Sequence, residues 1–294
     1  MTIHLDVFIY SCELLYQSDI INHIIMKLFN VFSKRNRILL RELVATDFKL
    51  RYQGSALGYA WSLLKPLFLF AIMYVVFGML IRIGSVEHYS VYLLLGIVLW
   101  TFFSEATNQG MGSIVGRGDL LRKINFPKYI IVLSTTISAL INLSLNLIIV
   151  GVLMAINGVE LQASALIFPL YVFEIYILAL GLAFFLSAVN VKYRDVSHIW
   201  EIIMQAAFYA TPIIYPLSII ITKSELVAKL LLLNPLAQAI QDARYALITT
   251  ETITVTKLFG NMAYITIPFI VVVVVFIAGT IYFKRNSKYF AEII

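Results

Sequence analysis

Long apolar stretches separated by short polar segments dominate this chain. A helix that crosses a bilayer needs about 20 mostly apolar residues. Pro212 and Pro216 are expected to kink or break one such stretch, because proline removes a backbone donor and clashes with the preceding turn. Six stretches come close to this length, and we predict membrane spans at about Pro66–Ile83, Tyr89–Met111, Tyr129–Ile156, Ala163–Val189, Ile199–Ile221 and Met262–Phe283.

A further helix is predicted before the first span, between Ser33 and Gln53. At helical spacing its apolar side chains fall on one face and its basic side chains on another. The apolar face holds Leu40, Leu43, Val44 and Phe48, and the basic face holds Arg37, Arg41 and Lys49. Such a helix suits the inner membrane interface. It is either a plain anchor or a gate that contacts a lipid-linked substrate or a partner.

The segment Thr222–Asn261 connects the fifth and sixth predicted spans. It contains two apolar stretches that are too short to cross a bilayer. We predict re-entrant or interfacial helices at Leu226–Leu233 and Leu236–Leu247. The predicted fold is an all-α integral membrane protein: six transmembrane helices, an N-terminal amphipathic interfacial helix and short re-entrant helices before the last span. Residues 1–32 are taken as an N-terminal extension, 33–62 as the interface helix and 63–294 as the transmembrane domain.

Composition supports a membrane protein, since 61% of the residues are hydrophobic and 13% are charged. A soluble domain has about a quarter of its residues charged. The net charge of +6 does not indicate nucleic-acid binding, because the basic residues separate apolar runs. Of the 22 Lys and Arg residues, 17 precede the first span or follow the second, fourth and sixth. Because Lys and Arg collect in cytoplasmic loops, both termini are predicted to be cytoplasmic.

Residue patterns for catalysis or metal binding were not found. The chain has one cysteine and four scattered histidines, and these do not match known metal-ligand spacings. Neither a P-loop nor a Gly-x-Ser-x-Gly elbow occurs. We therefore expect neither catalytic residues nor a cofactor in this chain. If ATP drives its function, a partner chain must bind ATP and Mg²⁺. Glu105 and Glu174 lie within predicted spans, where charged groups are costly and normally functional.

Two predicted inner loops carry charged residues that could contact a soluble partner. Ser113–Lys128 contains a candidate short helix, Leu120–Ile124, with Asp119 as its N-cap. The other loop contains Tyr193, Arg194 and Asp195. Each is either an ordinary solvated loop or a docking element.

Aromatic residues gather near the ends of the predicted spans. An interfacial belt is the default interpretation, and a pore lining on which sugar rings stack is the alternative. The residues are Tyr59, Trp61, Tyr74, Trp100, Phe102, Phe103, Tyr209 and Tyr215.

An ordered series of motifs resembles the permeases of polysaccharide-export ATP-binding-cassette transporters, which export O-antigen, capsule and teichoic acid chains. It begins with RELVATDFKLRYQGSALGYAWSLLKPLF, which contains Asp47, Arg51, Tyr52, Leu57, Gly58, Trp61, Lys65 and Pro66. Leu99-Trp100-x-Phe102-Phe103, Leu121-Arg122-Lys123-Ile124-x-Phe126-Pro127, Tyr193-Arg194-Asp195, Thr211-Pro212-Ile213-x-Tyr215-Pro216 and Asn234-Pro235 follow in order. Single motifs are weak, but the ordered set extends from about Arg35 to the C-terminus. The N-terminal extension departs from the pattern.

The resemblance implies a homodimer in the bacterial cytoplasmic membrane that works with two ATPase subunits. The loop from Gly118 through Asp119, Leu120, Leu121, Arg122, Lys123 and Ile124 to Asn125 resembles the family's coupling helix, and Tyr193–Asp195 is a second candidate contact. The basic amphipathic helix resembles its gate helix. The substrate would be a polysaccharide on an undecaprenyl diphosphate lipid, whose charge Arg37, Arg41 and Arg51 could neutralise. Tyr59, Trp61, Tyr74, Phe102, Phe103, Tyr209 and Tyr215 are candidate pore-lining aromatics.

Three other functions stay open from the sequence. A permease for a drug or small molecule would share the same architecture. A membrane transferase acting on lipid carriers is less favoured, because a candidate acid–base or nucleophile set was not found in the loops. In a channel or secondary carrier, Glu105 and Glu174 would be coupling sites.

Overall fold

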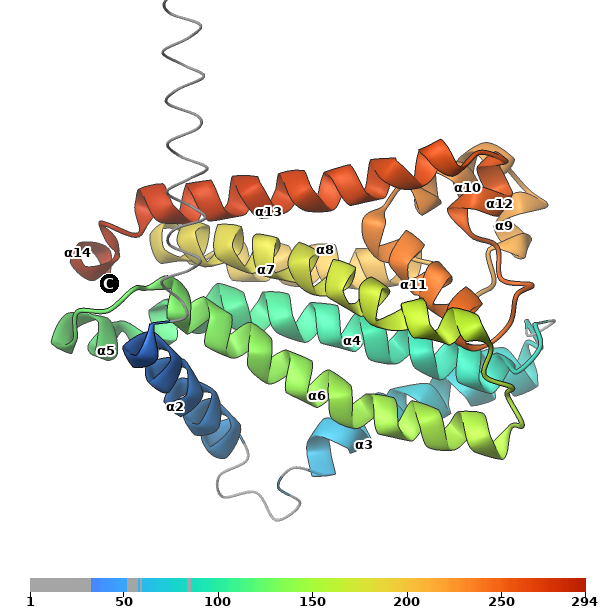
Figure 1. Ribbon diagram of the computed structural model, residues 1–294, viewed down its shortest axis with the longest axis horizontal. Helices are drawn as coiled ribbons and strands as arrows, with labels where there is room; N and C mark the ends of the chain where they lie inside the picture. The colour runs from blue at the N-terminus through green and yellow to red at the C-terminus, as the bar shows by residue number, and fades with distance from the viewer. Residues whose placement is uncertain (1–32, 52–57, 59, 84–85) are drawn as a thin grey trace, which may run out of the picture.

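The computed structural model describes residues 33–51, 58, 60–83 and 86–294. Every regular element in these residues is a helix, and the long helices lie roughly side by side in one elongated bundle (Figure 1). Five of them are long and apolar enough to cross a membrane: Ala60–Leu80, Tyr89–Ser113, Tyr129–Ile156, Ala163–Lys192 and Ala263–Asn286. They confirm five of the predicted spans.

Each span is built from one or two helical segments. The first is α3 (Ala60–Met73) continued by the π-helix η1 (Tyr74–Leu80), and it therefore begins at Ala60 rather than at Pro66. The second is α4 (Tyr89–Ser113) and the third is α6 (Tyr129–Ile156). The fourth joins η3 (Ala163–Ile167) to α7 (Phe168–Lys192), and the last joins η4 (Met262–Ile265) to α13 (Thr266–Asn286).

Pro66 is buried inside α3, where proline leaves the carbonyl of the residue four positions earlier without its helical donor. That carbonyl belongs to Ser62, and Asn146 Nδ2 of α6 lies 3.3 Å from it. A neighbouring helix thus supplies a donor that proline removes, which is how membrane helices tolerate proline.

The predicted helix Ile199–Ile221 is not continuous. Its first part is α8 (Val196–Ala210), and Thr211 already has an extended backbone with φ −81° and ψ 138°. The residue before a proline is pushed out of the helical region by the proline ring, and Thr211 precedes Pro212. After a turn over residues 211–217 the chain forms the short helix α9 (Ser218–Ile221).

The core of the bundle is α4, which packs against α3, α6, α7, α8 and the short helix α11 (Pro235–Leu247). Most α4 side chains between Val91 and Phe103 are buried. The tightest approach is between α7 and α13: a Cβ added to Gly279 would meet the carbonyl of Gly181, and one added to Gly181 would meet the backbone of Phe276. Small residues let membrane helices pack this closely.

Short helices gather at the two ends of the bundle (Figure 1). One end, called the α5 end below, carries η2 (Val115–Arg117), α5 (Gly118–Lys123), the C-terminal helix α14 (Phe290–Ile293) and part of α2 (Lys34–Arg51). The other, called the α11 end, carries α9, α10 (Glu225–Leu232), α11 and α12 (Val255–Phe259). The helices predicted at Leu226–Leu233 and Leu236–Leu247 correspond to α10 and α11. Helix α11 is buried and packs among α4, α7 and α13.

Candidate functional site

The predicted amphipathic helix is confirmed as α2, which packs against α6. Leu40, Leu43 and Val44 are half-buried, whereas Arg37 and Arg41 are exposed. The side chains of Arg51 and Phe48 lie outside the described part of the chain, so their predicted places on α2 stay predictions.

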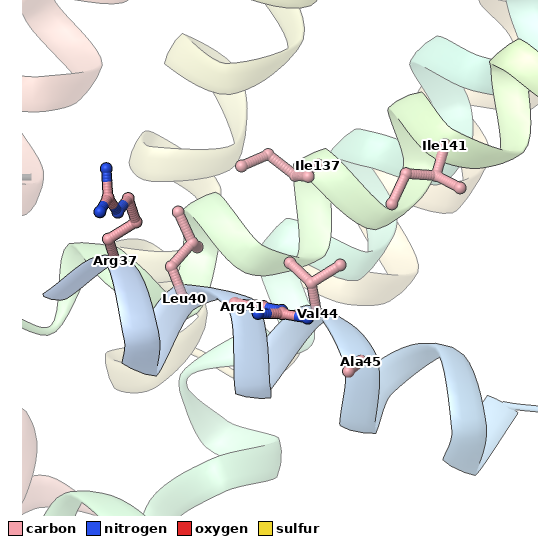
Figure 2. Close-up of a pocket in the computed structure, with 7 residues that line it drawn as sticks. All are labelled: Arg37, Leu40, Arg41, Val44, Ala45, Ile137 and Ile141. Carbon is pink, nitrogen blue, oxygen red and sulfur yellow. The ribbon is translucent and has the colours of Figure 1, made fainter. Parts of the chain in front are cut away.

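A groove of about 450 Å³ lies between α2 and α6. Figure 2 shows Leu40 and Val44 of α2 directed toward Ile137 and Ile141 of α6, with Arg37 standing at one end of the apolar strip. Arg41 and Ala45 complete the lining. An apolar floor beside two guanidinium groups offers space for a hydrocarbon chain and charge for an anionic head group.

The predicted short helix after α4 is confirmed as α5, although its start differs from the prediction. The N-cap position is occupied by Arg117, and Asp119 lies in the first turn instead. A carboxylate there still interacts favourably with the helix dipole. Gly118 and Leu121 are buried, whereas Asp119, Arg122 and Lys123 on α5 are exposed, as are Ile124 and Asn125 directly after it. Ile124 has half of its side chain exposed (51%), which leaves an apolar group among charged ones.

The C-terminal residues hold α5 against the bundle. A Cβ added to Gly118 would meet the side chain of Ile294, and Arg122 Nη2 donates to the carbonyl oxygen of Ile294 at 2.5 Å. Lys128 donates to the carbonyl of Ser287, and its Nζ lies 5.7 Å from the ring centre of Phe290. Burial lowers the pKa of the Lys128 amine below its usual value. Phe290 itself is buried against Phe283, with ring centres 5.4 Å apart.

The second predicted loop, Tyr193–Asp195, joins α7 to α8, and all three of its residues are exposed. The loop lies at the α5 end of the bundle (Figure 1). Lys192 Nζ lies 5.0 Å from the Tyr193 ring centre. Both predicted docking loops are thus accessible from the same end.

The candidate aromatics separate by exposure. Trp61 and Tyr209 are exposed, at 46% and 58%. Tyr74 stacks between Phe70 and Tyr89, and the Tyr215 hydroxyl lies 3.0 Å from the carbonyl of Tyr209. Phe102 and Phe103 are buried within the chain, where they pack in its main core. Tyr59 lies outside the described residues.

The two acidic residues of the spans occupy different surroundings. Glu105 Oε1 accepts from Gln109 Nε2 on α4 and from Asn142 Nδ2 on α6, both at 2.7 Å. Glu174 of α7 is 3% exposed. The helix beside it is α11, in which Gln238 Nε2 donates to Asp242 Oδ2 at 2.5 Å.

Arg244 lies in the segment Thr222–Asn261 between the fifth and sixth predicted spans, and it is fully buried in α11. Its Nε donates to the carbonyl of Tyr92 at 3.0 Å, and its two terminal nitrogens donate to the carbonyls of Pro212 and Ile213 at 2.6 and 2.7 Å. The guanidinium carbon lies 3.5 Å from the ring centre of Tyr92. Arg244 therefore supplies donors to the broken segment after α8. Arg244 and Pro212 are 32 residues apart in the chain, so no local sequence pattern predicts the contact between them.

Comparison with known proteins adds a family and three relatives. The model of the family described as ABC-2 type transporter matches residues 38–248, which include most of α2 and all of α5. One relative is the O-antigen export system permease protein RfbA of Myxococcus xanthus, 33% identical over 200 residues that cover 68% of this chain and 76% of the relative. Two RfbA permeases of Klebsiella pneumoniae are 26% and 25% identical over 257 residues, or 87% of this chain and 95% of each relative.

Proposed function

The chain belongs to the ABC-2 type transporter family, and we propose that it is the membrane-spanning subunit of an ATP-driven exporter that moves a lipid-linked polysaccharide across the bacterial cytoplasmic membrane. One observation carries the proposal. The family match covers most of the basic groove helix α2 and all of the exposed helix α5, and the similar relatives are O-antigen export permeases. The chain is accordingly a transport subunit rather than an enzyme.

The exposed face of α5 is the proposed contact with an ATP-binding subunit. Asp119, Arg122 and Lys123 are exposed charged residues that precede the exposed Ile124, so this segment offers charged groups and one apolar group to a partner. Tyr193–Asp195 lies at the same end and would extend that contact. The partner, in two copies, would bind ATP and Mg²⁺, and its movements would push on α5.

The groove between α2 and α6 is the proposed entry for the lipid carrier. Its apolar floor suits an isoprenoid chain, and Arg37 and Arg41 stand beside it. Guanidinium groups bind phosphate oxygens through paired donors, which makes arginine well suited to a diphosphate. Arg51, from the last turn of α2, would add a third cation.

Helix α8 supports a homodimer. His198, Glu201, Gln205 and Tyr209 follow one another at helical spacing, and all four are exposed. A charged side chain facing lipid near the bilayer centre costs about 2.5–3.5 kcal/mol. This face would therefore lie against a second copy or the polar path between two copies, where Tyr209 and Trp61 would present rings to passing sugars.

We also propose that α8 and the turn after it make a sixth crossing. Fifteen residues span about 22 Å as a helix, less than the roughly 30 Å of a hydrocarbon core. Residues 211–217, held by Arg244, would complete the distance, and α11 would be re-entrant. Because most basic residues lie at the α5 end, that end and both termini would be cytoplasmic.

The direct test is export in the source bacterium with the chain deleted and then restored. We expect surface polysaccharide to disappear, its lipid-linked form to accumulate inside the cell, and both changes to reverse when the wild-type chain returns. The affinity-purified chain should also bring with it a subunit that hydrolyses ATP. Unchanged surface polysaccharide, with altered resistance to small toxic compounds instead, would favour a small-molecule exporter and contradict the proposal.

A further inference from the structure

Helices α2 and α5 are connected by charged side chains for which the sequence motifs suggested no role. Asp47, near the end of α2, forms an ion pair with Arg117, the residue directly before α5. Both side chains are largely shielded from solvent, at 19% exposure for Asp47 and 17% for Arg117. Shielding weakens screening by salt, so this pair is stronger than an exposed one.

A third group fixes the geometry of the pair. Arg117 Nη1 donates to the hydroxyl of Ser134 at 2.9 Å, and Ser134 Oγ lies 3.4 Å from Asp47 Oδ2. Ser134 belongs to α6 and is fully buried. Arg117 thus bridges α2 and α6 with different nitrogens, which a planar fork of donors allows.

A second contact lies on the other side of α5. Arg35, in the first turn of α2, donates through Nη2 to the carbonyl of Asn125 at 2.9 Å. Asn125 follows α5 by two residues, whereas Arg117 precedes it directly. The two ends of α2 therefore hold the two flanks of α5.

We infer that Asp47 and Arg117 are positioning residues that make α2 move with α5, so that a push on α5 changes the groove where the lipid carrier enters. The inference rests on the proposed function, because it takes α5 as the docking site for the ATPase. An α5 that moved alone would break the ion pair and leave both charges partly buried, which is costly. Movement of both helices together keeps the pair intact.

The test uses the full complex of the permease with its ATPase and compares three measurements: copurification, ATP hydrolysis and export. Asp47→Asn removes one charge while keeping the shape of the side chain, and Arg117→Gln removes the other charge and replaces the guanidinium with a shorter neutral amide. We expect both variants to bind the ATPase and hydrolyse ATP at near wild-type rates, while export per folded complex falls about tenfold, as for a loss of about 1.4 kcal/mol. The charge exchange Asp47→Arg with Arg117→Asp should recover most of the export. The matched control is Glu42→Gln on the exposed face of α2, which should export normally.

Each outcome has a defined meaning. Wild-type chain that brings down no ATPase contradicts the proposed function itself. Wild-type chain that binds the ATPase, with normal export in both single-charge variants, overturns the positioning role while the proposed function stands. An exchange variant that folds and binds the ATPase but exports no better than the single variants also overturns it.

A distance measurement gives a second readout that does not depend on export. Spin labels on Lys49→Cys and Gly116→Cys, in a chain whose native cysteine is replaced by serine, report the separation of α2 and the η2 turn that leads into α5; both positions are exposed, and nothing lies within 4 Å of a Cβ added at Gly116. We expect one narrow distance distribution with and without ATP in the otherwise wild-type complex. Asp47→Asn should broaden it when ATP is added. A distribution that changes with ATP while the ion pair is intact would contradict joint movement.

Discussion

Arg244 joins three segments of the α11 end through one guanidinium group. Its donors reach carbonyls of α4 and of the segment after α8, and its plane covers the Tyr92 ring. Removing the donors leaves several buried carbonyls without partners, and each such group costs about 1–3 kcal/mol. Burial of this kind explains why a charged residue is tolerated inside the bundle.

We expect Arg244→Met to lower the free energy of unfolding in detergent by about 3–5 kcal/mol, because it deletes every donor while keeping much of the side-chain volume. Gly96→Ala should act through the same site, since its Cβ would meet the Arg244 guanidinium. The exposed Arg285→Gln is the control and should change stability by less than about 0.5 kcal/mol. Thermal unfolding of the purified chain measures all three. A stable Arg244→Met variant would show that the network is dispensable.

Single residues also mark the limit of prediction from sequence. The pattern of α2 was readable because its charged and apolar positions alternate at helical spacing. The sequence could not predict the partners of Asp47 and Arg244, because each partner belongs to an element far away along the chain. Burial of Phe102 and Phe103 was equally hidden, since an aromatic residue near a span end has the same sequence pattern whether it faces lipid, a pore or the core.

At the scale of elements, five spans were predictable because a long apolar segment in lipid must satisfy its own backbone hydrogen bonds, and a helix does so. The bounds predicted for α6 are the observed ones. The fifth stretch was harder, because apolar residues on both sides of Pro212 hide the point where the helix ends. Helix α11 was predicted as re-entrant or interfacial; it is buried among α4, α7 and α13, and Gln238 Nε2 donates to Asp242 Oδ2 within it.

The contact between α7 and α13 yields a test of element packing. Gly279→Val would place a branched side chain against the carbonyl of Gly181, and backbone cannot move aside as a flexible side chain can. We expect a loss of about 1–3 kcal/mol or more in stability, together with reduced export. Gly151→Ala on α6, where nothing lies within 4 Å of an added Cβ, is the matched control and should be neutral. Equal stability of both variants would argue against tight packing here.

Helix α5 is best tested on its exposed face. Leu121 is buried, so a charge there would disturb folding and docking together. We expect Lys123→Glu and Ile124→Asp to reduce ATPase binding at least tenfold, because each changes an exposed group available to a partner. Lys288→Glu, an exposed change beyond α13, is the control and should bind normally. Copurification from detergent measures binding, and full binding by both α5 variants would remove the docking assignment.

The whole molecule has two unlike ends, and its orientation decides which one faces the ATP-binding subunit that the family implies. The α5 end carries the groove cations, the exposed face of α5 and the C-terminal helix, whereas the α11 end carries the short helices α9 to α12. Basic residues predict that the α5 end is cytoplasmic. An even number of crossings is needed for both termini to share that side, so the proposed sixth crossing and the orientation can be tested together.

Single-cysteine labelling answers both questions in one experiment. The chain has one native cysteine, Cys12, which is first replaced by serine. Lys223→Cys lies after α9, whereas Lys123→Cys and Lys288→Cys lie at the α5 end, and all three positions are exposed. In intact spheroplasts we expect a membrane-impermeant maleimide to label Lys223→Cys, and to label the other two only after permeabilisation. The reverse pattern would invert the orientation. Labelling of Lys223→Cys and Lys123→Cys from one side would instead show that the chain does not cross at α8.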